Sequence, residues 1–307
     1  MNEKPVPFPA ALVSTDWLSG QLGSSDLLVI DSSVQLAASA PHLRPMRGAY
    51  LEAHIPGAVF ADLVNEVVEP DSPLGITRPS TRRAEAVFGR LGVGPRTRVV
   101  VYDCEFGQNA ARLWWLLKAN GHDAVALLDG GIRKWADEGR TVESGPVEPV
   151  PATFVAHPRP GMWSDRQQVL DAVNGMTDAT LVNAVPDLPA DPSVLPAGAA
   201  RVMSTTLPGS VDIPFPSMGQ PGTTTLPYPS INWPGSPMLR SGPDRAGRLT
   251  PVPRGRPTIV YCNSGLNAPL VGLCLVEAGY DAVSVYDGGL MEWLGDPQAP
   301  VTARAKR

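Results

Sequence analysis

The chain has 307 residues, a length that predicts two domains. Its composition, with 43% hydrophobic and 18% charged residues, is ordinary for a soluble protein. A net charge of -5 argues against a nucleic-acid partner, and no apolar stretch approaches the length of a membrane span. The opening residues contain no uninterrupted apolar core, which argues against a secretion signal. Three cysteines suggest a reducing compartment, so we expect a cytoplasmic protein without a disulfide framework.

Two halves of the chain match each other, at an offset of 158 residues in their most similar part. In that part, Asp-Gly-Gly and Trp are in register between the segments GHDAVALLDGGIRKW and GYDAVSVYDGGLMEW. The match predicts a tandem duplication with a first domain at 1–145, a proline-rich linker at 146–160 and a second domain at 161–307. In chain order, the matched segments are 27–31 with 180–184, 55–63 with 207–215, 97–102 with 257–261, and 121–135 with 279–293.

Each copy alternates short apolar segments, typical of strands, with stretches of helical periodicity. Apolar spacing predicts helices over 80–91 and 109–120 in the first copy and over 266–278 in the second. Short strands alternating with helices predict an α/β fold, in which each copy is a parallel sheet with helices on both faces.

The copies differ most over residues 186–257, which hold 16 of the 34 prolines. Proline removes a backbone donor and disfavours helix in the preceding residue, so a regular helix is not expected there. Three large apolar residues, Tyr228, Trp233 and Met238, instead predict an ordered excursion anchored on the core. The basic residues at the end of the chain, Arg304, Lys306 and Arg307, are expected to form a solvated tail.

Cys262 is the predicted reactive residue. It follows an apolar strand and precedes a helix, which is the edge of a parallel sheet where ligands bind and where free amides favour an anion. A thiol there should ionise more readily than a free one. The alternative is a small buried hydrophobic residue, which is the expectation for Cys274. Cys104 lies in the corresponding loop of the first copy, where Asp103 stands opposite Cys262; a structural role is favoured over that of a redox partner.

The chemistry of the Cys262 loop follows from its amides. The loop amide groups of Asn263, Gly265, Leu266 and Asn267 would stabilise a thiolate and an anion formed on it, such as a persulfide. The loop lacks the arginine that a cysteine phosphatase needs. Neither a Cys-x-x-Cys pair nor a glycine-rich nucleotide fingerprint is present, so no metal or organic cofactor is indicated.

These residues resemble the tandem-domain rhodanese family, the thiosulfate and 3-mercaptopyruvate sulfurtransferases. The resemblance covers nearly the whole chain and includes the cysteine loop and both Asp-Gly-Gly-x-x-x-Trp segments, together with His54-Ile55-Pro56-Gly57-Ala58 and the helix with Arg112, Trp114 and Trp115. It implies a persulfide on Cys262, a proton relay through Ser264, and a small-molecule sulfur donor with a thiol or other nucleophilic acceptor. The loop resembles the mercaptopyruvate type.

The resemblance also implies a substrate arginine just after the strand at 180–184, where this chain has Asn183-Ala184-Val185. Replacement charges could come from the excursion, although solvated surface arginines are the default expectation. The candidate substrate-binding residues are His54, Arg112, Arg240, Arg245 and Arg248, with Arg254 and Arg256 nearby. For His54, capping of the turn before Pro56 is an equal alternative. A binding module without turnover, or specialised thiolate chemistry, also stays open.

Overall fold

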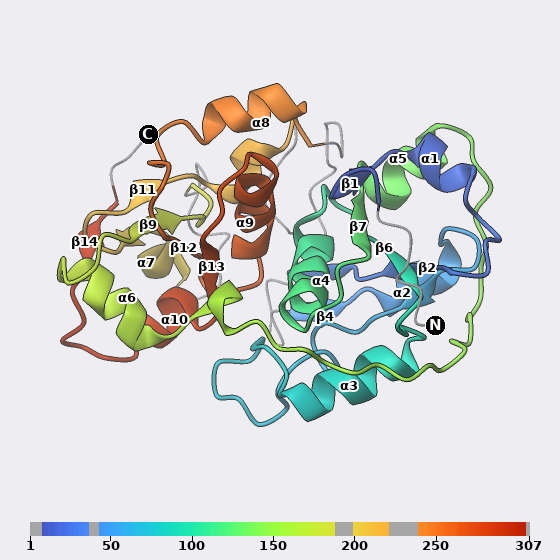
Figure 1. The fold of residues 1–307 in the computed structure, drawn as a ribbon, viewed down its shortest axis with the longest axis horizontal. Coiled ribbons are helices and arrows are strands. Elements are labelled where there is room, and N and C mark those ends of the chain that lie inside the picture. The colour runs from blue at the N-terminus through green and yellow to red at the C-terminus, as the bar shows by residue number, and fades with distance from the viewer. Residues whose placement is uncertain (1–7, 37–42, 188–198, 221–238, 305–307) are drawn as a thin grey trace.

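The computed structural model describes residues 8–36, 43–187, 199–220 and 239–304, which form two units of the same design (Figure 1). Each unit contains a five-stranded sheet whose strands all pair in parallel, as predicted. In spatial order the first sheet consists of β1 (Leu12–Val13), β7 (Val125–Leu128), β6 (Arg98–Tyr102), β2 (Leu27–Asp31) and β5 (Val59–Phe60). In the same order the second consists of β8 (Trp163–Ser164), β13 (Val283–Tyr286), β12 (Thr258–Tyr261), β9 (Thr180–Asn183) and β11 (Val211–Asp212).

Helices cover the sheets, and the three predicted helices are confirmed. The first unit contains α1 (Thr15–Ser19), α2 (Arg47–Glu52), α3 (Thr81–Arg90), α4 (Gln108–Ala119) and α5 (Gly131–Asp137). The second contains α6 (Arg166–Val173), α7 (Ala199–Met203), α8 (Gly242–Arg248), α9 (Ala268–Glu277) and α10 (Gly289–Trp293). Minor elements are the pairs β3 (Val34–Leu36) with β4 (Leu43–Pro45) and β10 (Thr205–Thr206) with β14 (Thr302–Ala303), and the 3-10 turns η1 (Pro160–Met162) and η3 (Phe215–Met218).

The strands of the first sheet are apolar on both faces because each face is buried. Val99 and Val101 of β6 pack in one cluster with α3 and α4. Val100 and Tyr102 point the other way, into a cluster with residues of α1 and α5. This alternation is the period of two expected of a strand, and it explains why the segment reads as continuously apolar.

Equivalent hydrogen bonds support the duplication at atomic detail. The hydroxyl of Tyr102, at the end of β6, accepts the Ile55 amide at 3.3 Å, and the hydroxyl of Tyr261, at the end of β12, accepts the Leu207 amide at 3.0 Å. The register of one matched pair needs correction. Asp31 pairs with Tyr102 and Asn183 with Tyr261, so Asp31 corresponds to Asn183 and the alignment of 27–31 with 180–184 is wrong by one residue.

The prediction that residues 186–257 contain no regular helix is wrong for α7 and for α8. Ser241 begins α8 by accepting the Asp244 amide, and Pro243 lies in its first turn, where its missing N–H costs no helical hydrogen bond. Proline therefore starts this helix instead of preventing it. The expected anchors Tyr228, Trp233 and Met238 lie outside the described residues.

The two units meet along α4 and α9, which lie side by side at the centre of the molecule (Figure 1). Gly272 of α9 faces Trp115 of α4 so closely that a Cβ on it would lie 2.8 Å from the indole ring. Nearby, the rings of Phe106 and Phe215 stack with centroids 5.8 Å apart. One apolar cluster runs through both units, so the interface is packed as a domain interior.

Candidate active site

Cys262 lies directly after β12, at the carboxyl end of the second sheet, and is only 1% exposed. The helix α9 begins six residues later, so the residues between form a short loop that starts at the sulfur. Asp103 occupies the equivalent place directly after β6. The structure thus puts the cysteine and the acid at matching positions of the two copies.

The carbonyl groups of the Cys262 loop are held by other parts of the chain. The amides of Leu290 and Met291, at the start of α10, donate to the carbonyl oxygens of Cys262 and Asn263, both at 2.9 Å. The guanidinium of Arg112 donates to the carbonyl oxygen of Gly265 at 3.2 Å. In a trans peptide the N–H points opposite to the C=O. Holding the carbonyls on one side therefore turns the following amides to the other side.

Glycine makes this close approach possible at two positions. Gly265 has a φ of +72°, and a Cβ there would overlap the carbonyl oxygen of Asp287. Gly289, the last glycine of the second Asp-Gly-Gly, has a φ of +57°, and a Cβ on it would lie 2.5 Å from the carbonyl oxygen of Cys262. Both positions need a backbone that other residues adopt only at a cost.

The first copy shows what the loop geometry binds. The carboxylate of Asp103 accepts hydrogen bonds from the amides of Glu105, Gly107, Asn109 and Ala110, at 2.9 to 3.0 Å. This loop is a cradle of amides around one negative group. The offset of 158 residues places Gly265, Asn267 and Ala268 at the positions of three of these donors.

In the second copy, the amides of residues 263–267 donate to no other group among the described residues. Cys262 stands where Asp103 stands in the first copy. Equivalent loops therefore follow a thiol in one domain and a carboxylate in the other. Backbone amides without an internal partner are the groups with which such loops bind anions.

The other two cysteines lack these features. Burial raises the pKa of the Cys274 thiol to about 12, within the apolar helix α9, which agrees with its predicted core position. The pKa of Cys104 is also raised well above its ordinary value, first by burial and then by the charges of Glu105 and Asp103. Its sulfur lies 3.2 Å from the sulfur of Met46. Neither thiol has the properties of a nucleophile.

Ser264 and its neighbours complete the predicted loop. Ser264 is half-buried, and its hydroxyl makes no hydrogen bond to another described residue, so it is free to contact a small molecule. The side-chain oxygen of Asn263 is buried without a partner in the part of the chain that the structure describes. Leu266 packs against Val68 and Ile76 of the first domain, and Asn267 precedes α9.

Arg112 occupies a different place from the one expected for a substrate-binding residue. It is 1% exposed at the domain interface, where it pairs with Asp287 at 2.5 Å in addition to holding Gly265. Its guanidinium also lies 5.2 Å from the ring centre of Trp163. Sequence reasoning could not assign this role, because the partners lie 153 and 175 residues away.

His54 is fully buried within the first domain. Its Nδ1 lies 2.9 Å from the carbonyl oxygen of Tyr50, its ring stacks on the Tyr50 ring, and its backbone pairs with Glu143. These contacts fit the alternative in which His54 fixes the turn before Pro56.

The excursion arginines differ in exposure. Arg245 is buried and paired with Glu277 at 2.9 Å, so it supplies charge to that carboxylate. Arg240 donates to the carbonyl oxygen of Ser217, while Arg248 is exposed to solvent. Of the three, Arg248 therefore fits the expected solvated surface arginine.

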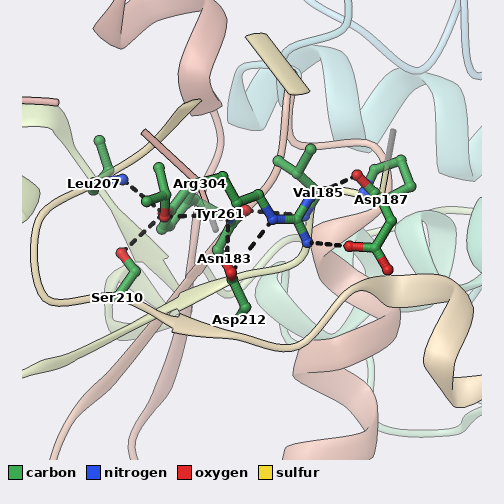
Figure 2. A network of polar contacts seen from close by, with 10 residues as sticks. Asn183, Val185, Asp187, Leu207, Ser210, Asp212, Tyr261 and Arg304 are labelled. Atoms are coloured by element: carbon green, nitrogen blue, oxygen red, sulfur yellow. Dashed lines mark hydrogen bonds and ion pairs between the residues drawn. The ribbon is translucent and has the colours of Figure 1, made fainter. Parts of the chain in front are cut away.

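The predicted solvated tail is wrong for Arg304. Its side chain is only 5% exposed, donates to the carbonyl oxygen of Pro186 at 2.6 Å and approaches Asp187 and Asp212 (Figure 2). The backbone holds it there because β14 pairs with β10. Lys306 and Arg307 lie outside the described residues. The pairing of a two-residue strand has no sequence signal strong enough to reveal this position.

Next to Arg304, Val185 occupies the position where the resemblance implies a substrate arginine. It is fully buried, and its amide donates to the side chain of Asn183 at 3.0 Å (Figure 2). Among the described residues, no group of three or more His, Cys, Asp or Glu side chains is arranged to hold a metal ion. No described helix is both long and apolar enough to cross a membrane.

Comparison with known proteins gives consistent results. The family described as Rhodanese-like domain matches residues 14–138 and 203–296. Thiosulfate sulfurtransferase of Mus musculus is 31% identical over 297 residues, covering 92% of this chain and 91% of its own length. The 3-mercaptopyruvate sulfurtransferase of Homo sapiens is 30% identical with the same coverage. The crystal structure of SseA from Escherichia coli, described as a 3-mercaptopyruvate sulfotransferase, aligns with a TM-score of 0.75 and 26% identity, covering 91% of this chain and 98% of that chain.

Proposed function

Because the chain belongs to the rhodanese family of tandem-domain sulfurtransferases, we propose that it transfers a sulfane sulfur from a small donor to a nucleophilic acceptor through a persulfide on Cys262. The observation that supports this most is the pair of equivalent loops. In one, amides surround the Asp103 carboxylate; in the other, the corresponding amides follow Cys262 and have no partner among the described residues. A persulfide anion would fill the second cradle as the carboxylate fills the first.

The reaction proceeds in two displacement steps. The Cys262 thiolate attacks the transferable sulfur of the donor, an S–S bond forms, and the donor's bond to that sulfur breaks. The electron pair leaves with the rest of the donor, as sulfite from thiosulfate or as the enolate from a mercaptopyruvate-type donor. The acceptor nucleophile then attacks the outer sulfur, the S–S bond breaks, and its electrons regenerate the Cys262 thiolate.

Residues 263–268 provide no basic side chain, which favours a donor whose leaving group needs a proton more than a fixed positive charge. An enolate is such a leaving group. The half-buried hydroxyl of Ser264 lies two residues from the sulfur and makes no hydrogen bond to a described residue, so it can pass a proton to the departing carbon. This supports a mercaptopyruvate-type donor over thiosulfate. The three cysteines are all free, which agrees with action in a reducing compartment such as the cytoplasm.

The test is the intact mass of the protein after exposure to 3-mercaptopyruvate or thiosulfate. We expect one added sulfur atom, removed again by a small thiol or by cyanide. Cys262→Ser should abolish the gain, while the matched variant Cys274→Ser, which removes a buried thiol of α9, should retain it. Failure of both donors to load sulfur on Cys262 would contradict the proposal and favour a binding module without turnover.

A further inference from the structure

We propose that Arg112 of the first domain is a positioning residue that holds the Gly265 carbonyl and thereby fixes the backbone of the loop that follows Cys262. This inference rests on the proposed function, because it concerns the same loop. It assigns the first domain, whose own loop contains Asp103 in place of a cysteine, a direct part in forming the site.

The contacts of Arg112 fix it from three directions. Its Nη1 donates both to the carbonyl oxygen of Gly265 at 3.2 Å and to a carboxylate oxygen of Asp287 at 2.5 Å. The other oxygen of Asp287 accepts the amide of Arg78 at 2.6 Å, so the carboxylate is itself held by the first domain. The flat guanidinium lies near Trp163, 5.2 Å from its ring centre.

The Gly265 carbonyl is the contact that matters for the site. The C=O of Gly265 and the N–H of Leu266 belong to one planar peptide and point in opposite directions. Glycine has no Cβ and restricts its own backbone little, so the peptide that follows Gly265 could otherwise turn. A donor that holds this carbonyl therefore fixes the peptide and, through it, the loop whose amides have no partner among the described residues.

Stability alone does not explain this arginine. Arg112 is 1% exposed, yet its Nε and Nη2 have no hydrogen-bond partner among the described residues. A buried ion pair that leaves donors unsatisfied is often no better than an apolar pair of the same size. The charge has a further effect, because it neutralises Asp287, whose carboxylate would otherwise disfavour a thiolate in the adjacent loop.

The experiment measures the pH dependence of Cys262 alkylation in the full-length protein, followed by mass spectrometry of the Cys262 peptide. We compare Arg112→Gln and Arg112→Lys with Arg98→Gln, a control that removes another buried first-domain arginine, paired with Asp26. In Arg112→Gln the alkylation curve of Cys262 should move to higher pH, since a donor and a neutralising charge are lost. Arg98→Gln should lower the melting temperature and leave the thiol pKa unchanged.

The lysine variant separates position from charge and is used alone if Arg112→Gln does not fold. Lysine keeps the charge but cannot reproduce the planar guanidinium, so its thiol pKa should lie between those of Arg112→Gln and the wild type. A wild-type thiol pKa in Arg112→Gln or in Arg112→Lys would overturn the inference. Because alkylation needs no sulfur donor, failure of the protein to load sulfur would contradict the proposed function without deciding the role of Arg112.

Discussion

Replacing Asp31 by asparagine should change the stability of the protein in a pH-dependent way. Relative to the wild type, the variant should be more stable at neutral pH than at acidic pH. Asp31 ends β2 and is 3% exposed, and burial raises the pKa of its carboxyl group from 3.8 to about 6. The duplicated domain indicates that asparagine fits this place. Asn183 occupies the equivalent position and accepts the amide two residues later at 3.0 Å, as Asp31 does at 2.9 Å.

The sign of the effect follows from the raised pKa. The fold favours the protonated carboxyl group, so this group contributes stability below pH 3.8 and loses it as the pH rises through about 6. A shift of about 2 units corresponds to about 3 kcal/mol. Asparagine does not ionise. The stability of Asp31→Asn relative to the wild type should therefore increase by about 2.5 kcal/mol between pH 4 and pH 8, because at pH 4 the unfolded carboxyl group is already partly ionised.

Denaturant unfolding of both proteins at pH 4, 6 and 8 measures this difference. The control is Asp26→Asn, where the hydrogen bond from Arg98 holds the carboxyl pKa below its ordinary value. Asp26 contributes stability above pH 3.8 and loses it only at lower pH, so the effect of this variant should stay constant across the range. A difference for Asp31→Asn that does not change with pH would refute the reasoning.

Two further predictions concern packing and the end of the chain. Gly272→Ala places a methyl group 2.8 Å from the Trp115 ring, whereas Gly247→Ala, at an exposed position of α8, meets nothing within 4 Å. In thermal unfolding, the first variant should be less stable than the second by about 1–3 kcal/mol. Equal stability would disprove close packing of α4 on α9. Arg304→Ala removes a buried guanidinium that donates to the Pro186 carbonyl and lies beside Asp187 and Asp212, and should lose roughly 2 kcal/mol in denaturant unfolding. Arg90→Ala, at an exposed pair, should lose less than about 1 kcal/mol. Similar losses would contradict the buried placement of Arg304.

The sequence was sufficient for features that are repeated or local. The duplication predicted two parallel sheets, and the strand before Cys262 placed this residue at the carboxyl end of the second sheet. Composition of a single segment was less reliable: prolines in 186–257 argued against helix, but Pro243 lies in the first turn of α8, where it is tolerated.

Features that depend on distant pairing were not predictable. Arg112 belongs to a helix that the sequence identifies, but the sequence does not show that this helix faces the second domain. Arg304 follows a strand of two residues, too short for a periodic pattern. In both cases the role is set by a partner more than a hundred residues away, and a local pattern contains no information about it.

The reciprocal contacts of the two Asp-Gly-Gly segments have a consequence for how the molecule is assembled. Asp287 of the second domain accepts the amide of Arg78 from the first, while Asp129 of the first accepts the amide of Leu239 from the second, at 3.1 Å. Two separate copies of one domain would make such paired contacts about a twofold axis in a homodimer. Joining the copies in one chain makes this association independent of protein concentration. It also lets the two halves change separately, so that one keeps the thiol while the other supports it.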